Sequence, residues 1–142
     1  MKPIQIVLDT NVIYAGLRSK RGASFKLLQH LESGLFELNL SVPLVLEYEE
    51  VLLRKKSTLV FTEQEIAQLL DYLCQLSNLH EVHFLWRPIL NDPNDDMILD
   101  VAVRANCEFI VTYNKRDFTG VNQFGINVVT AQEFLKLIEV IK

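Results

Sequence analysis

The sequence predicts an α/β fold with a mainly parallel central sheet. Short unbroken runs of β-branched and aliphatic residues are typical of strands buried on both faces. Segments with helical spacing separate these runs along the whole chain, without a Pro/Gly/Ser-rich linker or a repeat. The length of 142 residues suits one domain, so we expect residues 1–142 to fold as a single unit.

The first three elements are predicted to be a strand, a helix and a second strand. The run from Ile4 to Leu8 predicts a buried strand that stops at Asp9. Apolar residues recur at helical spacing between positions 24 and 34, and Gly34 is expected to cap that helix at its C-terminus. Residues 37–42 predict the second strand.

Two further helices and a weak strand follow. Pro43 occupies a position favoured at the start of a helix, and an apolar stripe continues to residue 52. Thr62, with Glu65 three residues later, forms a capping-box pattern for a helix that ends near Asn78. Residues 81–85 give a weak strand signal.

The last part of the chain repeats the alternation of helix and strand. Residues 92–96 (DPNDD) are turn and cap chemistry, and apolar residues at helical spacing follow from 98 to 105. Residues 109–112 and 127–130 predict two strands, and residues 131–141 a closing helix. The apolar side chains of that helix suit core packing better than a homodimer interface.

Composition limits the cellular setting and the class of partner. The net charge of −4 argues against holding duplex DNA by bulk electrostatics, although bound cations can reverse the field of an acidic site. Cys74 and Cys107 are far apart and are expected to be reduced thiols. No signal peptide or membrane-spanning stretch is visible, so a cytoplasmic location is expected.

Carboxylates occur where strands of the predicted sheet end. Asp9 follows the first strand, Asp117 lies shortly after the strand over 109–112, and Asp96 lies in the first turn of the helix before that strand. Ligands of open parallel sheets bind beyond the carboxyl ends of the strands, so these acids are expected at one edge. Grouped carboxylates favour a hard cation such as Mg2+ or Mn2+. Spacing alone also fits helix caps and turns, a role that suits Asp95 better than a ligand role.

Other acidic motifs fit less well. A phosphoaspartate enzyme of the dehalogenase type needs a second Asp where this chain has Asn11. A calcium loop starting at Asp92 fails because Met97 and Val103 replace its glycine and its bidentate glutamate. The chain has neither a dinucleotide-binding glycine motif nor a P-loop. Three histidines lack an accompanying ligand set: His30, His80 and His83.

Four sequence blocks, in order, resemble the PIN-domain family, and in particular its branch described as toxin components of toxin–antitoxin systems. The first two blocks are residues 7–12 (VLDTNV) and 41–43 with 47–52 (SVP, EYEEVL). The third is 92–96 (DPNDD) with Ile98, Leu99 and Ala102, and the fourth is 110–112 (IVT) with Asn114, Asp117 and Phe118. This resemblance implies a three-layer α/β/α fold and a metal-dependent endoribonuclease. An antitoxin protein would then be a partner besides the RNA substrate.

The resemblance also implies roles for individual residues. The catalytic acids would be Asp9, Glu47, Asp96 and Asp117, of which Asp9, Asp96 and Asp117 would bind the metal. Asp95 replaces Asp96 if the helix starts one residue early. Four residues would orient ligands or the scissile phosphate through hydrogen bonds: Thr10, Asn11, Thr112 and Asn114.

The implied reaction is metal-assisted hydrolysis, which leaves a 5′ phosphate and a 3′ hydroxyl on RNA. Finding a 2′,3′-cyclic phosphate would exclude it. Basic residues near the strand ends would contact flanking phosphates, or else remain solvated: Arg18, Lys20, Arg21, Lys115 and Arg116. The alternative from a different functional class is a non-catalytic PIN-fold module that binds RNA or a protein.

Overall fold

The computed structural model describes residues 2–81 and 90–142, and these ranges contain one five-stranded sheet with the order β3-β2-β1-β4-β5. Every neighbouring pair of these strands is parallel. The strands are β1 (Ile4–Leu8), β2 (Phe36–Leu40), β3 (Asn78–Leu79), β4 (Phe109–Val111) and β5 (Asn127–Val129). The predicted α/β fold class is confirmed.

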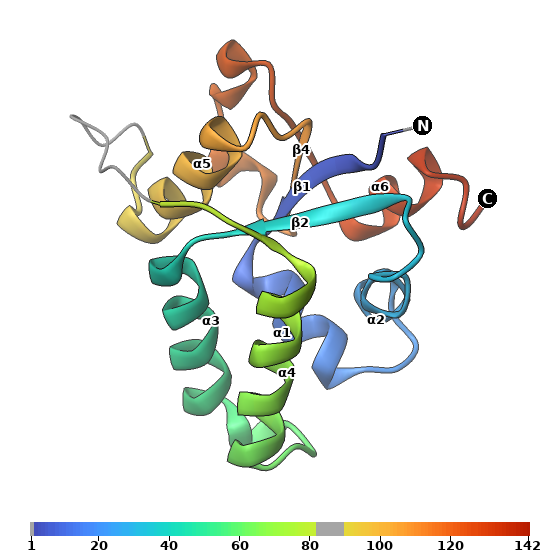
Figure 1. Cartoon of the computed structure of the whole chain (residues 1–142), viewed down its shortest axis with the longest axis vertical. Helices are drawn as coiled ribbons and strands as arrows, with labels where there is room; N and C mark the ends of the chain where they lie inside the picture. Colours follow the sequence, from blue (N-terminus) through green and yellow to red (C-terminus); the bar gives the residue numbers. More distant parts are fainter. Residues whose placement is uncertain (1, 82–89) are drawn as a thin grey trace.

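The order of the strands explains the layers of helices. The chain moves outward from β1 to β2 and β3, then returns past β1 to β4 and β5. Right-handed crossovers in opposite directions put their helices on opposite faces of the sheet. Figure 1 shows α1, α3 and α4 on one side of β1 and β2, and α5 on the other. These helices are α1 (Thr10–Arg18), α3 (Val42–Arg54), α4 (Glu63–Leu76) and α5 (Pro93–Arg104).

Local capping explains where α3 and α4 begin. The Ser41 hydroxyl accepts the backbone N–H of Leu44 at 3.3 Å, and Pro43 lies in the first turn of α3. The predicted capping box of α4 is confirmed, because Thr62 and Glu65 exchange bonds of 3.1 and 2.9 Å. A short 3-10 helix, η1 (Lys56–Thr58), joins the two helices.

Near the start of the chain, one helix was not predicted and one helix cap was misplaced. The helix α1 was not expected, although its Val12 and Ile13 are fully buried and its Thr10 is 8% exposed. α2 (Ala23–Gln29) ends five residues before Gly34, so that glycine is not its cap. Gly34 instead has a φ of +82° in the turn before β2, a conformation that glycine adopts without steric cost.

β3 was also misplaced by the sequence pattern. It pairs through Asn78 and Leu79 with the end of β2, whereas the weak signal was at residues 81–85. That predicted strand, except for Glu81, lies outside the described residues. The edge position explains the weak signal, because both residues of β3 are exposed.

After β4 the chain forms two 3-10 helices, η2 (Lys115–Phe118) and η3 (Val121–Phe124), before β5. The final helix α6 (Ala131–Leu137) is shorter than predicted, and a capping box between Thr130 and Glu133 starts it. Phe134 and Leu135 are fully buried, as expected for core packing, while Leu137 is 56% exposed. In the described ranges no helix is long and apolar enough to cross a membrane.

Candidate functional site

Asp9 lies at the topological switch point of the sheet, where the strand order reverses between β1 and β4, at the carboxyl ends of these two strands. Its backbone N–H donates to the Val111 carbonyl at 2.9 Å, which extends the pairing of the two strands by one residue. Asp9 occupies the N-cap position of α1, yet its carboxylate forms no cap bond with that helix. The carboxylate instead accepts the Thr112 hydroxyl at 2.7 Å. The predicted switch-point position of this acid therefore matches the sheet order.

The surroundings of Asp9 act on its ionisation in opposite directions. Burial is the main factor and raises the pKa of Asp9 above its ordinary 3.8, since only 9% of the residue is exposed. The hydrogen bond from Thr112 and the nearby Thr10 backbone lower it, while the charges of Asp117 and Asp92 raise it. Asp9 is thus held in one orientation and electrically coupled to two other acids.

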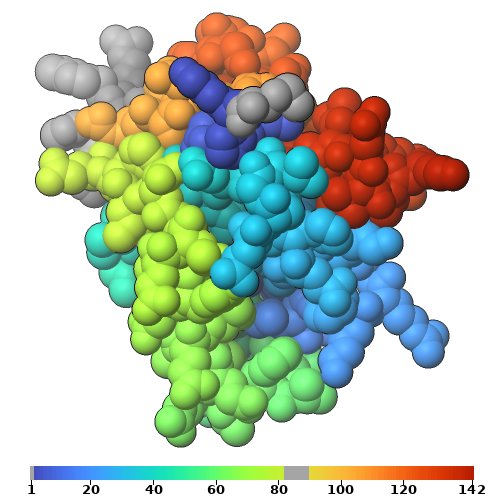
Figure 2. Space-filling view, turned by 45° about the vertical axis from the view of Figure 1, so that its right-hand side comes forward, coloured from blue at the N-terminus to red at the C-terminus, as the bar shows by residue number. Residues whose placement is uncertain are grey.

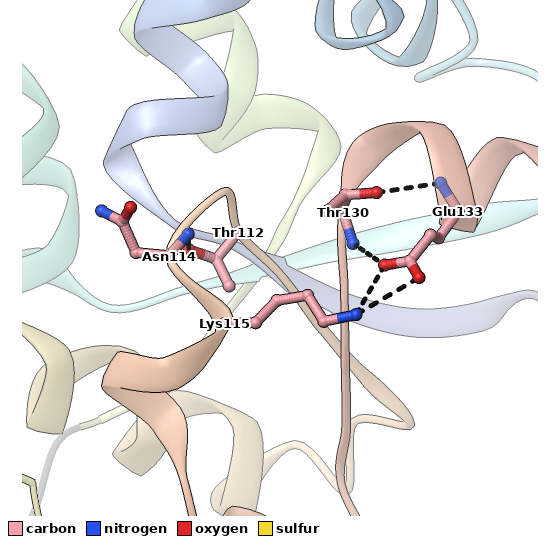
Figure 3. A network of polar contacts seen from close by, with 5 residues as sticks. All are labelled: Thr112, Asn114, Lys115, Thr130 and Glu133. Carbon is pink, nitrogen blue, oxygen red and sulfur yellow. Dashed lines mark hydrogen bonds and ion pairs between the residues drawn. The ribbon is translucent and has the colours of Figure 1, made fainter.

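Thr112 is the centre of a small hydrogen-bond network at the end of β4. It is fully buried, and its hydroxyl accepts the Asn114 backbone N–H at 3.0 Å (Figure 3). The Asn11 amide lies 3.4 Å from the same hydroxyl, and the Asn11 carbonyl oxygen accepts the Tyr113 N–H at 3.4 Å. Asn11 and Thr112 therefore bind the start of α1 to the segment after β4. Asn114 contributes through its backbone.

Glu47 reaches the same region from α3. Tyr48, next to it in sequence, is 1% exposed and donates its hydroxyl to the Leu8 carbonyl, which fixes α3 against the end of β1. Burial chiefly raises the pKa of Glu47, with further increases from Glu50, Asp92 and Asp9 and an opposing effect of Arg54. Glu47 is therefore within electrostatic reach of Asp9.

The first turn of α5 brings two neighbouring acids to this edge. Asp92 is the N-cap, and its carboxylate accepts the Asn94 N–H at 2.9 Å. The pKa of Asp95 is raised to about 7, first by burial and then by the charges of Asp9, Asp92, Asp117 and Asp96. The carboxylate of Asp96 accepts the Leu90 N–H at 3.0 Å.

An open pocket of about 320 Å³ joins α5 to η2. Five residues line it: Asn91, Asp92, Asp95, Arg116 and Asp117. Asp117 is exposed, and its own N–H donates to the Asn114 carbonyl at 3.0 Å, which ties η2 to the segment after β4. Asp95 and Asp117 therefore share one pocket, whereas Asp96 is not among the lining residues.

The acids are coupled but do not converge on a single point. Within residues 2–81 and 90–142, no group of three or more His, Cys, Asp or Glu side chains is arranged to hold one metal ion. The compact carboxylate cluster predicted from the sequence is therefore not found in this part of the chain. The acids surround an open edge of the sheet and repel one another there.

Sequence reasoning missed some residues of this edge and misjudged others. It treated Asp95 as a cap, although Asp92 performs that function. Nothing in the sequence pattern indicated the bond from Tyr48 to β1, because a tyrosine on an apolar helix stripe usually signifies only packing. Two of the three histidines bond to protein oxygens, His30 to the Lys26 carbonyl and His80 to Asn39, and His83 lies outside the described residues.

The basic residues predicted to contact phosphates lie in different places. Arg116 lines the acidic pocket. Lys115 forms an exposed ion pair of 3.0 Å with Glu133 at the start of α6, as Figure 3 shows. Lys20 and Arg21 belong to another pocket, between α2 and α6, and Arg18 ends α1.

Comparison with known families agrees with this geometry. No curated protein matches the sequence. Residues 5–116 match the PIN domain, a range that runs from β1 through the acids of α3 and α5 to η2. PIN domains are generally nucleases that act on phosphodiester bonds, and they typically use divalent metal ions. The match covers most of the 142 residues, and this chain therefore belongs to the PIN-domain family.

Proposed function

We propose that this protein is a divalent-metal-dependent endoribonuclease, located in the cytoplasm, that hydrolyses RNA phosphodiester bonds at the acidic edge of its sheet. The observation that supports this most is the coupling of acids from separate elements at the switch point. Asp9 follows β1, Glu47 lies on α3, Asp95 on α5 and Asp117 on η2, and their charges act on one another. A purely structural role gives no reason to bring like charges together.

The donor chemistry of this edge fits a hard divalent cation. Its side chains offer carboxylate oxygens, which Mg2+ and Mn2+ prefer. Repulsion helps to raise the pKa of Asp95 to about 7, and a cation between the acids would relieve that repulsion. Such an ion would supply activation of water and stabilisation of the charge that develops on the phosphodiester.

Each residue of the edge has a distinct part in this proposal. Thr112 orients Asp9 through the bond of 2.7 Å, and Asn11 holds the segment that carries Thr112. Glu47, whose pKa is raised, would accept a proton from the attacking water at its carboxylate. Asp117, which lines the pocket together with Asp95, would complete the ligands.

The third acid is either Asp95 or Asp96. We favour Asp95, because it shares the pocket with Asp117 and is coupled to Asp9, whereas the Asp96 carboxylate accepts the Leu90 N–H. In that case Asp96 positions the chain before α5. The two neighbours differ only in position, so Asp95→Asn and Asp96→Asn form a matched pair of variants.

Labelled RNA and purified protein test this function directly. Structured and unstructured RNAs are incubated with Mn2+, Mg2+ or EDTA, beside the Asp9→Asn variant. Cleavage by the wild type that EDTA abolishes and Asp9→Asn lacks is the expected result, with 5′ phosphate ends. Equal cleavage by Asp9→Asn would assign the activity to a contaminant or to another site. If Asp96→Asn is inactive and Asp95→Asn is not, the third acid is Asp96.

The second candidate is a non-catalytic PIN-fold module that binds RNA or a protein. It is favoured by the lack of a three-residue metal group in the described ranges. Thermal unfolding with increasing Mn2+ separates the candidates without any substrate. A cation site raises the melting temperature in a saturable way that Asp9→Asn weakens, whereas a module without a site shows no such rise.

A role as the toxin of a toxin–antitoxin pair is a further part of the proposal and rests on the family resemblance. An antitoxin would then cover the acidic edge, and an Arg of that partner would fit its carboxylates. Homodimer formation is a separate possibility for the exposed Leu137 of α6. Co-expression with a neighbouring gene product and light scattering, respectively, test these two points.

A further inference from the structure

A second pocket, on the α2 side of the molecule, has the opposite charge. It has a volume of about 410 Å³ and lies between α2 with its preceding loop and α6. None of its lining residues is acidic. Figure 2 shows the two walls, with α6 and the C-terminal residues (red) above the segment of α2 (light blue). The lining side chains that matter here are Lys20, Arg21, Phe25, Lys26, Gln29 and Gln132.

The cations of this pocket are available to a ligand. Lys20, Arg21 and Lys26 are exposed, and none of them forms an ion pair with an acid in the described part of the chain. The contrast is Lys115, whose ammonium is paired with Glu133. In a protein with a net charge of −4, three such cations around one hollow form a local positive field.

Two contacts connect this pocket to the acidic edge. Tyr113, which follows Thr112 directly, is 44% exposed, and its hydroxyl hydrogen-bonds to the buried Ser24 of α2. Lys115 contacts Glu133, the residue after Gln132 of the pocket wall. The segment 112–117 therefore contacts α2 and α6, the two helices that form the basic pocket, while Thr112 bonds to Asp9. Tyr113 thus links the acidic edge to α2, the helix that carries Phe25 and Lys26 of the pocket.

We propose that this pocket binds the single-stranded RNA that flanks the cleaved bond, in a subsite separate from the acids. This inference rests on the proposed nuclease function. Cations would contact phosphates, while the half-buried Phe25 and the exposed Tyr113 offer faces for base stacking. Two glutamine amides offer hydrogen bonds to base edges. Cations beside the ring of Phe25 favour nucleic acid over an acidic protein segment, which has no bases to stack.

Binding without cleavage tests the subsite. All proteins carry Asp9→Asn, and the probe is a fluorescently labelled single-stranded RNA whose anisotropy is measured over a series of salt concentrations. The variant Lys20→Gln with Lys26→Gln removes two cations of the pocket. Its control, Lys55→Gln with Lys56→Gln, removes the same charge outside the pocket, at the tip formed by α3 and η1 (Figure 1). That control removes a cation–π contact with the half-buried Tyr14 and an exposed ion pair with Glu63.

The expected result is a weaker complex for the pocket variant alone. The slope of log affinity against log salt should fall by about 0.7 for each phosphate that the protein no longer neutralises, so by about 1.4 for both lysines. Tyr113→Leu should weaken binding roughly tenfold, whereas Tyr113→Phe, which keeps the ring, should not. Equal slopes for the pocket variant and its control would overturn the proposal.

Cleavage assays with the same lysine substitutions made without Asp9→Asn keep this result separate from the proposed function. If the wild type cleaves RNA and the pocket variant binds and cleaves as the control does, the nuclease stands and the subsite is refuted. If no protein cleaves but the pocket variant alone binds more weakly, the subsite stands and the nuclease assignment fails. Circular dichroism melts of all variants show whether each of them is folded.

Discussion

Replacing Thr112 with valine tests the network that orients Asp9. Valine has nearly the same shape as threonine, so the fully buried site keeps its packing. The substitution removes the hydroxyl, and with it the bond of 2.7 Å to the Asp9 carboxylate and the acceptor of the Asn114 N–H. Thr112→Ser is the matched control, because it keeps the hydroxyl and removes only a methyl group.

The two substitutions should differ clearly in the free energy of unfolding. A hydrogen bond to a charged group contributes about 1.5–3 kcal/mol, so Thr112→Val should be destabilised by about 2–3 kcal/mol. Thr112→Ser removes one buried methyl group, which costs about 1 kcal/mol. Urea denaturation at neutral pH without added metal measures both values. If Thr112→Val is as stable as Thr112→Ser, the hydroxyl does not support Asp9.

The penalty should also depend on pH. Burial already raises the pKa of Asp9 in the folded protein above 3.8, and the Thr112 hydroxyl lowers it. Without the hydroxyl the folded-state pKa rises further, so the folded protein binds more protons than the unfolded chain over a wider range. Stability then falls more steeply as pH rises through this range. The difference between Thr112→Val and the wild type should be smallest below pH 3.8 and largest at neutral pH; a constant difference would exclude coupling to Asp9.

Three further predictions concern stability and thiol chemistry. Gly16→Ala should lower stability by about 1–3 kcal/mol in urea unfolding, because its Cβ would lie 2.5 Å from a leucine methyl, while Gly22→Ala meets nothing within 4 Å. Glu139 has a φ of +63°, a conformation that glycine adopts more readily. Glu139→Gly should therefore increase the free energy of unfolding by up to about 1 kcal/mol, which a higher melting temperature would show. Burial raises the pKa of the Cys107 thiol to about 12, so a disulfide reagent at mildly alkaline pH should modify Cys74 first in the folded protein. Equal rates for the two thiols would contradict this burial.

Much of the fold was determined by the sequence pattern. β1 and β4 lie where unbroken apolar runs predicted them, because strands buried on both faces need apolar residues at every position. The capping box at Thr62 located the start of α4 to the residue, since a cap depends on groups only three residues apart. Local patterns of this kind are visible before any tertiary contact is known.

Elements that tertiary contacts stabilise were not visible in this way. α1 begins with Thr10 and Asn11 and contains β-branched residues and a glycine, all of which disfavour helix in isolation. It forms because Val12 and Ile13 are completely buried in the core. β3 exists because Asn78 and Leu79 pair with the end of β2, and two exposed residues carry no hydrophobic pattern.

The positions of the acids at the sheet edge were likewise determined partly by the sequence and partly by the tertiary structure. The sequence by itself determined that Asp9 ends a buried strand and that Asp117 follows another, because strand ends are encoded locally. Only the tertiary structure decided that Asp95 is coupled to Asp9 and shares a pocket with Asp117, while its neighbour Asp96 bonds to Leu90. Adjacent helical residues point about 100° apart, so the burial of the apolar face of α5 fixes which carboxylate faces the pocket. The orientation of α5 about its own axis therefore depends on contacts between residues that are far apart in the sequence.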